Sequence, residues 1–225
     1  MKIAVTKLEE KSEGIPELFR RYGHEAVIVS TMRAAPPTDQ KPLTKLCEMI
    51  SENKIDIIIF TSSLGVEKLF EKVRPGKNVR IVSVGPKTAK KVEEYGLKSE
   101  TIEKYSSDDF AQYLGDTKDK TIGIARAEVP NPELLQSLES KGAKIVEASA
   151  YCLVPGGSIV EALKNVDAVI FTSAKSFEYS GFTKDLAKKL KVVAIGQKTA
   201  DAMRKNGITP ELVGDGTLEN CLSQL

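Results

Sequence analysis

The sequence predicts an α/β protein of two similar domains, each a five-stranded parallel sheet flanked by helices. Short β-branched runs alternate with amphipathic stretches almost throughout the chain, as is typical of βαβ units. The length of 225 residues is about one and a half times an average domain, which leaves one large or two small domains open. An internal repeat favours two domains.

Ten strands are predicted at fairly regular intervals. They are expected near residues 2–6, 25–30, 56–60, 80–84, 97–101, 121–124, 143–148, 167–171, 191–195 and 209–213. Helices are predicted between them, for example over 86–95, which has Pro86 near its start and Gly96 just after its end. Residues 106–109, with the sequence SSDD, indicate a further helix start rather than an acid–base pair, because the two carboxylates are adjacent.

The repeat relates the two halves of the chain. Residues 56–62, DIIIFTS, match residues 167–173, DAVIFTS, at an offset of 111 (167 minus 56). The same offset relates VGPKTA at 84–89 to IGQKTA at 195–200. A shorter match upstream pairs PEL at 16–18 with PEL at 132–134. We interpret this pattern as a duplicated five-strand α/β unit of the flavodoxin-like type.

Two domain arrangements are compatible with the repeat, and both leave five strands in each domain. One boundary would fall between the halves, near residues 115–120. Alternatively, the Pro/Gly-rich stretches 34–37 and 154–157 lie at equivalent points of the two repeats, which predicts that the chain changes domain twice. In that arrangement the first domain comprises residues 1–34 and 153–225, the second residues 38–150, and the linkers residues 35–37 and 151–152.

Composition excludes several classes of function. A net charge of +2 removes the electrostatic case for a protein that binds nucleic acid or a membrane surface. No apolar run approaches the roughly 18 residues of a membrane span. Three scattered cysteines and a single histidine, His24, predict neither a disulfide framework nor a metal site, and favour the cytoplasm. The GxSxG, Walker A and GxGxxG motifs are absent.

The repeated FTS segments are the first candidates for a ligand site. Each ends a hydrophobic strand and precedes a helix, and ligands of open α/β sheets bind at the carboxyl ends of strands. Hydroxyls and helix-start amides there would bind an anion, or the hydroxyls would only cap the helix. The candidate residues are Thr61, Ser62, Ser63, Thr172 and Ser173.

The repeated strand–glycine–helix turns are the second group of candidates. A Lys and a Thr fall in the first helical turn, where free amides attract negative charge. The Gly-Lys-Thr order of a P-loop is missing, so a carboxylate is a better ligand than a nucleotide phosphate. A tight turn with a helix cap is the alternative. The candidate residues are Gly85, Lys87, Thr88, Gly196, Lys198 and Thr199.

Two further residues are candidates because of their positions relative to the predicted strands and linkers. Arg126 follows the strand predicted over 121–124, so it also lies at a carboxyl end and is a candidate anion ligand. Tyr151 directly precedes the second crossing between the domains. A purely structural role is the alternative for either residue.

These features together resemble the uroporphyrinogen-III synthase family. The paired FTS strand ends, the segments VGPKTAKKVEEYG and AIGQKTADAMRKNG, and Tyr151 carry the resemblance, which covers essentially the whole chain in order. It implies two α/β domains joined by a two-stranded linker. It also implies cyclisation of hydroxymethylbilane to uroporphyrinogen III, without a cofactor, in the cleft between the domains. The terminal hydroxyl is lost, and a spiro intermediate inverts the last pyrrole ring.

The resemblance also implies roles for particular residues. Tyr151 matches a tyrosine that assists departure of the hydroxyl, and Thr88 and Thr199 match threonines of the cleft. Lys7 stands where many members have an arginine, and is a further candidate for substrate binding. Leu64 and Lys175 depart from the family pattern, which has a small or polar residue after FTS-x.

The resemblance also implies particular partners, and two other functions remain as alternatives. The implied partner is the substrate hydroxymethylbilane, with transient contact with hydroxymethylbilane synthase, and the protein is expected to be a cytoplasmic monomer that binds neither nucleic acid nor membrane. The main alternative is a two-lobed binding or sensor module for an anionic small molecule, without catalysis. A different transferase that acts on anionic substrates is a third interpretation.

Overall fold

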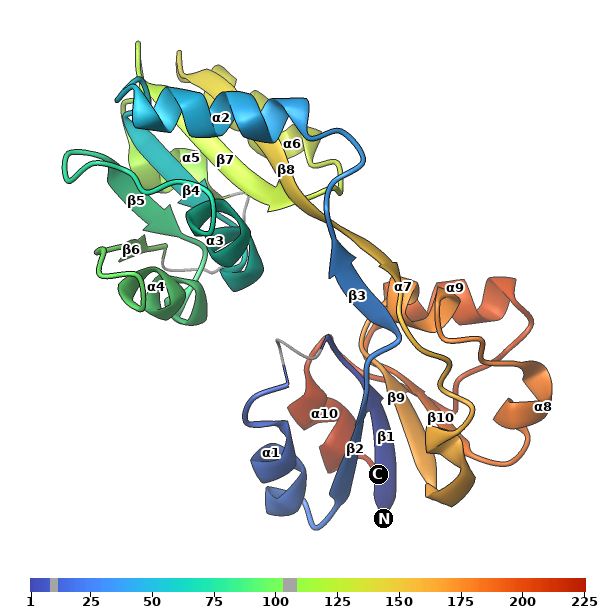
Figure 1. Cartoon of the computed structure of the whole chain (residues 1–225). Coiled ribbons are helices and arrows are strands. Elements are labelled where there is room, and N and C mark those ends of the chain that lie inside the picture. The colour runs from blue at the N-terminus through green and yellow to red at the C-terminus, as the bar shows by residue number, and fades with distance from the viewer. Residues whose placement is uncertain (9–11, 103–108) are drawn as a thin grey trace. The chain divides into compact units, whose positions relative to one another are not determined.

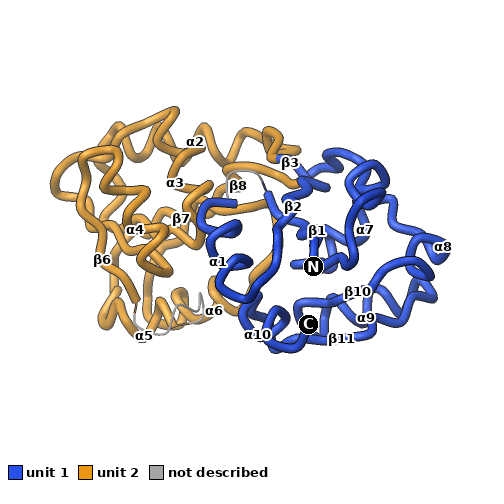
Figure 2. Tube along the Cα trace, turned by 90° about the horizontal axis from the view of Figure 1, so that it is seen from below, with its two compact units in different colours: residues 1–33, 154–225 blue, residues 34–153 orange. Residues whose placement is uncertain are grey.

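The chain divides into two units, each with its own sheet. The computed structural model describes residues 1–8, 12–102 and 109–225. Unit 1 comprises residues 1–33 and 154–225, and unit 2 comprises residues 34–153 (Figures 1 and 2). The sequence-based boundaries at 34, 38, 150 and 153 stay a prediction about independently folding domains.

Unit 1 is a five-stranded sheet with helices on both faces. The strand order is β11-β10-β9-β1-β2, and neighbouring strands are parallel. The strands are β1 (Lys2–Thr6), β2 (Glu25–Val29), β9 (Ala168–Phe171), β10 (Lys191–Ala194) and β11 (Leu212–Val213). The helices are α1 (Ile15–Arg21), the 3-10 helix η3 (Ala162–Asn165), α7 (Ala174–Glu178), α8 (Lys184–Ala187), α9 (Gln197–Lys205) and α10 (Leu218–Ser223).

Unit 2 contains most of a six-stranded sheet with the order β3-β8-β7-β4-β5-β6. The strands are β3 (Met32–Ala35), β4 (Ile57–Phe60), β5 (Arg80–Ser83), β6 (Glu100–Thr101), β7 (Thr121–Ala127) and β8 (Lys144–Pro155). The helices are α2 (Lys41–Ser51), α3 (Ser63–Phe70), α4 (Pro86–Glu93), α5 (Phe110–Leu114) and α6 (Pro132–Glu139). Among the described residues, no helix has the length and hydrophobicity that a membrane span requires.

The two sheets have the same strand order, but the chain enters that order at a different strand in each unit. If the strands of unit 1 are numbered along the chain, their order in the sheet is 2-1-3-4-5, as in flavodoxin-like folds. Unit 2 has the same order when β7 and β8 are counted before β4, β5 and β6. Unit 2 is therefore a circular permutation of unit 1. This explains why the PEL match lies in α1 of one unit and in α6 of the other.

The predicted class, parallel sheets flanked by helices, is confirmed, and all ten predicted strands are present. The expected strands at 97–101 and 209–213 shorten to the two-residue edge strands β6 and β11. Strand β3 is not among the ten strands predicted from the pattern, because residues 34–37 indicate a linker, but the family resemblance does imply a two-stranded linker here. Strand β3 pairs with the long strand β8. Within the described chain, these two are the only strands that contain a boundary between the units (Figure 1). The helix start expected at 106–108 lies outside the described residues, and α5 begins at Phe110.

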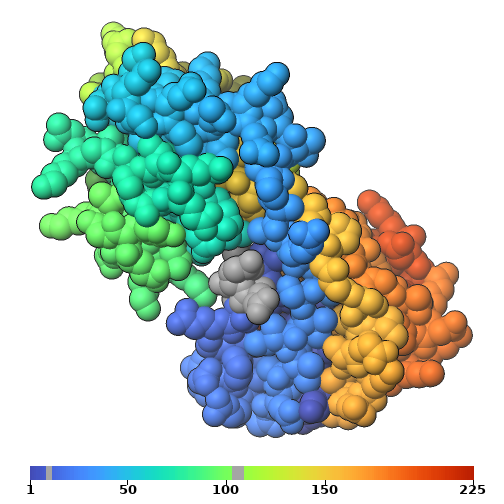
Figure 3. Space-filling view, in the orientation of Figure 1, coloured from blue at the N-terminus to red at the C-terminus, as the bar shows by residue number. Residues whose placement is uncertain are grey.

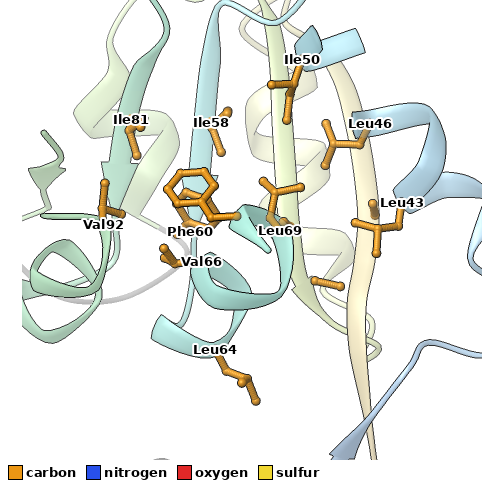
Figure 4. Packing of buried hydrophobic residues seen from close by; sticks show 14 of the residues in the cluster. Leu43, Leu46, Ile50, Ile58, Phe60, Leu64, Val66, Leu69, Ile81 and Val92 are labelled. Carbon is orange, nitrogen blue, oxygen red and sulfur yellow. The ribbon is translucent and has the colours of Figure 1, made fainter. Parts of the chain in front are cut away.

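Hydrophobic clusters line both faces of each sheet. In unit 2, α2, α3 and α4 pack on one face (Figure 4), and α5 and α6 on the other. Leu43, Leu46 and Ile50 of α2 are spaced so that they share one side of the helix, and all three are buried. The outer sides of α2 and α3 form part of the unit surface (Figure 3). Because both faces are covered, β4 is apolar at every position, Ile57–Phe60.

Helix α3 lies so close to β7 that Gly65 has no room for a side chain. A Cβ there would be 2.7 Å from the carbonyl oxygen of Ala125. We expect Gly65→Ala to lower the free energy of unfolding by about 1–3 kcal/mol, because α3 must move away from the sheet. Urea denaturation measures this change. Gly157→Ala is the control: its Cβ would meet nothing nearer than 3.8 Å, so it should change stability little.

Candidate active site

Both units present a carboxyl edge at which the strand order reverses. The reversal lies between β1 and β9 in unit 1, and between β7 and β4 in unit 2. Ligands of open α/β sheets bind at this point. Val5 pairs with Ile170, and Ile124 pairs with Ile59, which is the repeat equivalent of Ile170. Two residues further on, Lys7 therefore occupies the same place in unit 1 as Arg126 in unit 2.

Tyr151 and Ser62 meet at the edge of unit 2. The Tyr151 hydroxyl lies 3.3 Å from Ser62 Oγ, and the Tyr151 residue is 3% exposed. A register shift at the end of β7 pairs Arg126 with Ser149 but Ala127 with Tyr151, so that β8 has one extra residue there. This bulge places the successive side chains of Ala150 and Tyr151 in one core cluster. The sequence contains no clear signal for it.

Ser62 and Ser173 cap the helices that follow them. Ser62 Oγ accepts a hydrogen bond from Gly65 N at 3.1 Å, and Ser173 Oγ accepts one from Ser176 N at 3.0 Å. The capping interpretation is thus confirmed for both serines, while their role in substrate binding stays a prediction. Thr61 and Ser63 are half-buried beside Ser62.

A buried hydroxyl network, which was not predicted from the sequence, holds the edge of unit 1 together. Thr6 Oγ1 accepts a hydrogen bond from Thr172 N at 3.0 Å and lies 2.9 Å from Ser176 Oγ. The Thr172 hydroxyl donates to the Thr6 carbonyl, and Thr31 Oγ1 donates to the Ser176 carbonyl at 2.9 Å. Ser176 lies three residues after Ser173 of the FTS segment, and Gly65 is its repeat equivalent. A serine at that spacing in one repeat was the available signal.

The glycine turns begin α4 and α9 without a side-chain cap in the described part of the chain. Gly85 and Gly196 have φ of −172° and −170°, an extended backbone that any residue adopts. These glycines are therefore not required for an unusual dihedral angle. Their contribution is that they have no side chain to cap the helix start, which stays open to a ligand. Lys87 and Lys198 are exposed in the first turn of each helix, where the helix itself leaves amides unpaired.

Thr88 and Thr199 occupy equivalent positions in these turns. They are 5% and 3% exposed, and their amides donate to Gly85 O and Gly196 O at 3.0 and 3.1 Å. Neither hydroxyl makes a hydrogen bond with a described residue. Every fully buried polar side-chain atom that the structure describes does have a partner. Both hydroxyl oxygens therefore reach the surface beside the open helix starts.

The remaining residues are two candidate ligands, Arg126 and Lys7, and two departures from the family pattern, Leu64 and Lys175. The Arg126 side chain is buried, and its Nη1 lies 3.4 Å from Glu147 Oε1 in an ion pair. Lys7 is half-buried at the end of β1, where its amide donates to Val29 O at 3.1 Å. Of the two departures from the family pattern, Leu64 is part of the core of unit 2 (Figure 4) and Lys175 is half-buried on α7.

Solved structures show the same fold. The uroporphyrinogen-III synthetase of Helicobacter pylori 26695 is 18% identical, with a TM-score of 0.60, and the match covers 100% of this chain and 98% of that one. A mutant uroporphyrinogen III synthase of the extremely thermophilic bacterium Thermus thermophilus is 20% identical, with a TM-score of 0.57 and coverage of 100% and 96%.

Sequence comparison identifies the family. Porphyrin biosynthesis protein HemD of Ruminiclostridium josui is 25% identical over 251 residues, which cover 100% of this chain and 48% of that protein. The chain thus matches about half the length of such curated relatives. The family model described as uroporphyrinogen-III synthase HemD matches residues 13–220. This match includes most of both units, and the chain therefore belongs to the uroporphyrinogen-III synthase family.

Proposed function

We propose that this chain is a uroporphyrinogen-III synthase. It closes linear hydroxymethylbilane to uroporphyrinogen III, with inversion of the terminal pyrrole ring and without a cofactor. The observation that carries the proposal is the family match over residues 13–220, which extends through both units and both carboxyl edges.

The chemistry of the edges suits a polycarboxylate substrate. Each unit offers an uncapped helix start with a surface-reaching threonine hydroxyl and an exposed lysine. At these helix starts a carboxylate can meet the amides of Lys87 and Lys198 and the threonine hydroxyls, because Pro86 has no N–H and the Thr88 and Thr199 amides already donate to Gly85 O and Gly196 O. Fixed dipoles also stabilise charge that develops during a reaction. We propose that Thr88 and Thr199 each hold a substrate carboxylate.

Tyr151 is the proposed proton donor to the leaving hydroxyl. A phenol carries its proton at neutral pH and can both donate and accept a hydrogen bond. Its contact with Ser62 Oγ ties the phenol oxygen to the N-terminal cap of α3, which orients it at the carboxyl edge. The electrophile is then generated within the substrate itself, when the hydroxyl departs as water.

We also propose that the protein acts as a monomer in the cytoplasm. It would contact hydroxymethylbilane synthase only transiently. Size-exclusion chromatography with light scattering should give a mass near the 24.5 kDa of the chain. A stable dimer at micromolar concentration would contradict the monomer.

The isomer composition of the product tests the proposed activity. Freshly made hydroxymethylbilane is incubated with the protein in a buffer without added metal or nucleotide, and the products are oxidised and separated. We expect the type III isomer to predominate. If ample protein gives only the spontaneous type I isomer, the chain is not a synthase, and the anion-binding module without catalysis becomes the better account.

Replacing Thr88 or Thr199 by valine should raise KM about tenfold, because each hydroxyl donates to a charged carboxylate. Valine keeps the shape of the buried side chain, so the fold should be retained. Steady-state kinetics on hydroxymethylbilane measure the change. Thr44→Val on the exposed side of α2, where Thr44 Oγ1 donates to Gln40 O at 3.1 Å, is the control and should leave KM unchanged. Unchanged KM in both site variants would remove these threonines from the site.

A further inference from the structure

Arg126 is a buried cation with weak pairing. Its side chain is 7% exposed, and its ion pair with Glu147 is 3.4 Å long. A guanidinium has five N–H donors, yet this one makes no hydrogen bond within residues 1–8, 12–102 and 109–225. No fully buried polar side-chain atom in this part of the chain lacks a partner, so the open donors of Arg126 reach the surface.

Glu147 also forms part of the wall of a pocket at the loop between β7 and α6. Arg126 is not itself a lining residue, but it contacts Glu147 and directly precedes Ala127, and both of these residues line the pocket. The pocket has a volume of about 420 Å³, near the lower end of the roughly 300–1000 Å³ of small-molecule sites. Its other walls are mostly apolar and include Pro42, Val129, Pro132 and Leu135. All of these residues belong to unit 2.

The carboxylates of this pocket differ in their freedom to exchange partners. Glu128 Oε2 accepts two hydrogen bonds from Thr38, from the amide and from Oγ1, both at 3.0 Å. Glu147 has a side chain that is 34% exposed and contacts Arg126 at a distance too long for a strong charge-assisted hydrogen bond. Moving the Glu147 carboxylate into water is therefore the smaller change.

We propose that this pocket binds one carboxylate-bearing pyrrole ring of the substrate, whose carboxylate replaces Glu147 as the partner of Arg126. This inference rests on the proposed function. A bidentate pair between a guanidinium and a carboxylate has N–O distances of roughly 2.7–2.9 Å, so the exchange gains a stronger contact. The apolar walls bury the ring, and burial of apolar surface adds affinity.

In the free protein Glu147 then keeps the buried charge of Arg126 paired. It competes with the ligand for the same cation. Removing its charge should have two effects of opposite sign: the free protein loses stability, and the ligand binds more tightly because nothing has to be displaced. If the ion pair is purely structural, removing the charge of Glu147 should lower the stability of the protein and should either lower the ligand affinity or leave it unchanged.

Fragment titration followed by NMR tests the exchange. The probes are pyrrole-3-propionate, its amide, and propionate without a ring. The acid should shift the amide signals of residues 127–135 in the wild type, while the amide and propionate bind at least about tenfold more weakly. In Glu147→Gln the acid should bind about two- to fivefold more tightly. In Arg126→Gln it should bind no better than the amide probe does.

Equal binding of the acid and the amide probe, or weaker or unchanged acid binding in a folded Glu147→Gln protein, would overturn the proposal. If Glu147→Gln does not fold, Glu147→Asp serves instead, since its shorter side chain withdraws the carboxylate from Arg126 and should also tighten binding. The titration requires no turnover. A wild type that binds the acid as expected but forms no type III isomer would refute the proposed activity and leave the pocket assignment standing.

Discussion

Replacing Tyr151 by phenylalanine should lower turnover about a hundredfold, because the reaction loses its proposed general acid. The ring stays in its core cluster, and only the oxygen 3.3 Å from Ser62 Oγ is removed. The loss of that hydrogen bond should cost only about 1 kcal/mol of stability. Activity should be reduced rather than abolished, since water or a substrate carboxyl group can supply the proton more slowly. Single-turnover kinetics with hydroxymethylbilane measure the effect.

Ser62→Ala is the matched control for this prediction. It removes one hydrogen-bond partner of the phenol and the cap of α3, at a cost of about 1 kcal/mol of stability, but it keeps the proton donor. Its turnover should fall far less than that of Tyr151→Phe. A loss of about fivefold or less in Tyr151→Phe would mean that the phenol only hydrogen-bonds. Wild-type turnover with unchanged stability would exclude Tyr151 from the site.

Truncating either of two equivalent phenylalanines should destabilise only the unit that contains it. Phe60 and Phe171 are fully buried, and each has an edge-to-face contact at 5.3 Å, with Phe70 and Phe177 respectively. Phe→Ala in a core costs about 3–5 kcal/mol. Hydrogen exchange read by mass spectrometry should show lost protection in residues 34–153 for Phe60→Ala, and in residues 1–33 and 154–225 for Phe171→Ala.

Val160→Ala, at an exposed position of unit 1, is the control and should change stability by less than about 0.5 kcal/mol. If Phe171→Ala exposed both units to exchange together, the chain would unfold as one cooperative body. That result would contradict the proposal of two domains that fold independently with boundaries near residues 34 and 153.

The sequence predicted the fold well because its strongest signals are local. A buried parallel strand such as β4 reads as a continuous apolar run, and the FTS and glycine turns mark where such strands end. The repeat then related β4 to β9 and α4 to α9. The pattern did not predict strand β3, because residues 32–35 have no strand pattern of their own and pair with β8; only the family resemblance implied a two-stranded linker there.

The site was predicted less completely because its contacts join distant parts of the chain. The bulge that sets Tyr151 beside Ser62 depends on the register of β7 and β8. The Thr6–Ser176 contact spans 170 residues, so the serine at this spacing in the repeat marks a position but does not indicate its partner. The sequence could place hydroxyls at strand ends, but it could not show that Ser62 and Ser173 serve as caps while Thr88 and Thr199 reach the surface.

The central claim, that the carboxyl edges of both units bind the tetrapyrrole, can be tested directly by NMR. Amide signals of the wild type are followed while uroporphyrinogen III is added without oxygen. We expect the largest shifts at residues 61–63 and 85–88 of unit 2, and at residues 172–173 and 196–199 of unit 1. Unit 2 also has a pocket of about 610 Å³ at the amino end of β5, lined by residues from 76–81 and 96–100. Shifts confined to that pocket, with both carboxyl edges unchanged, would contradict the account.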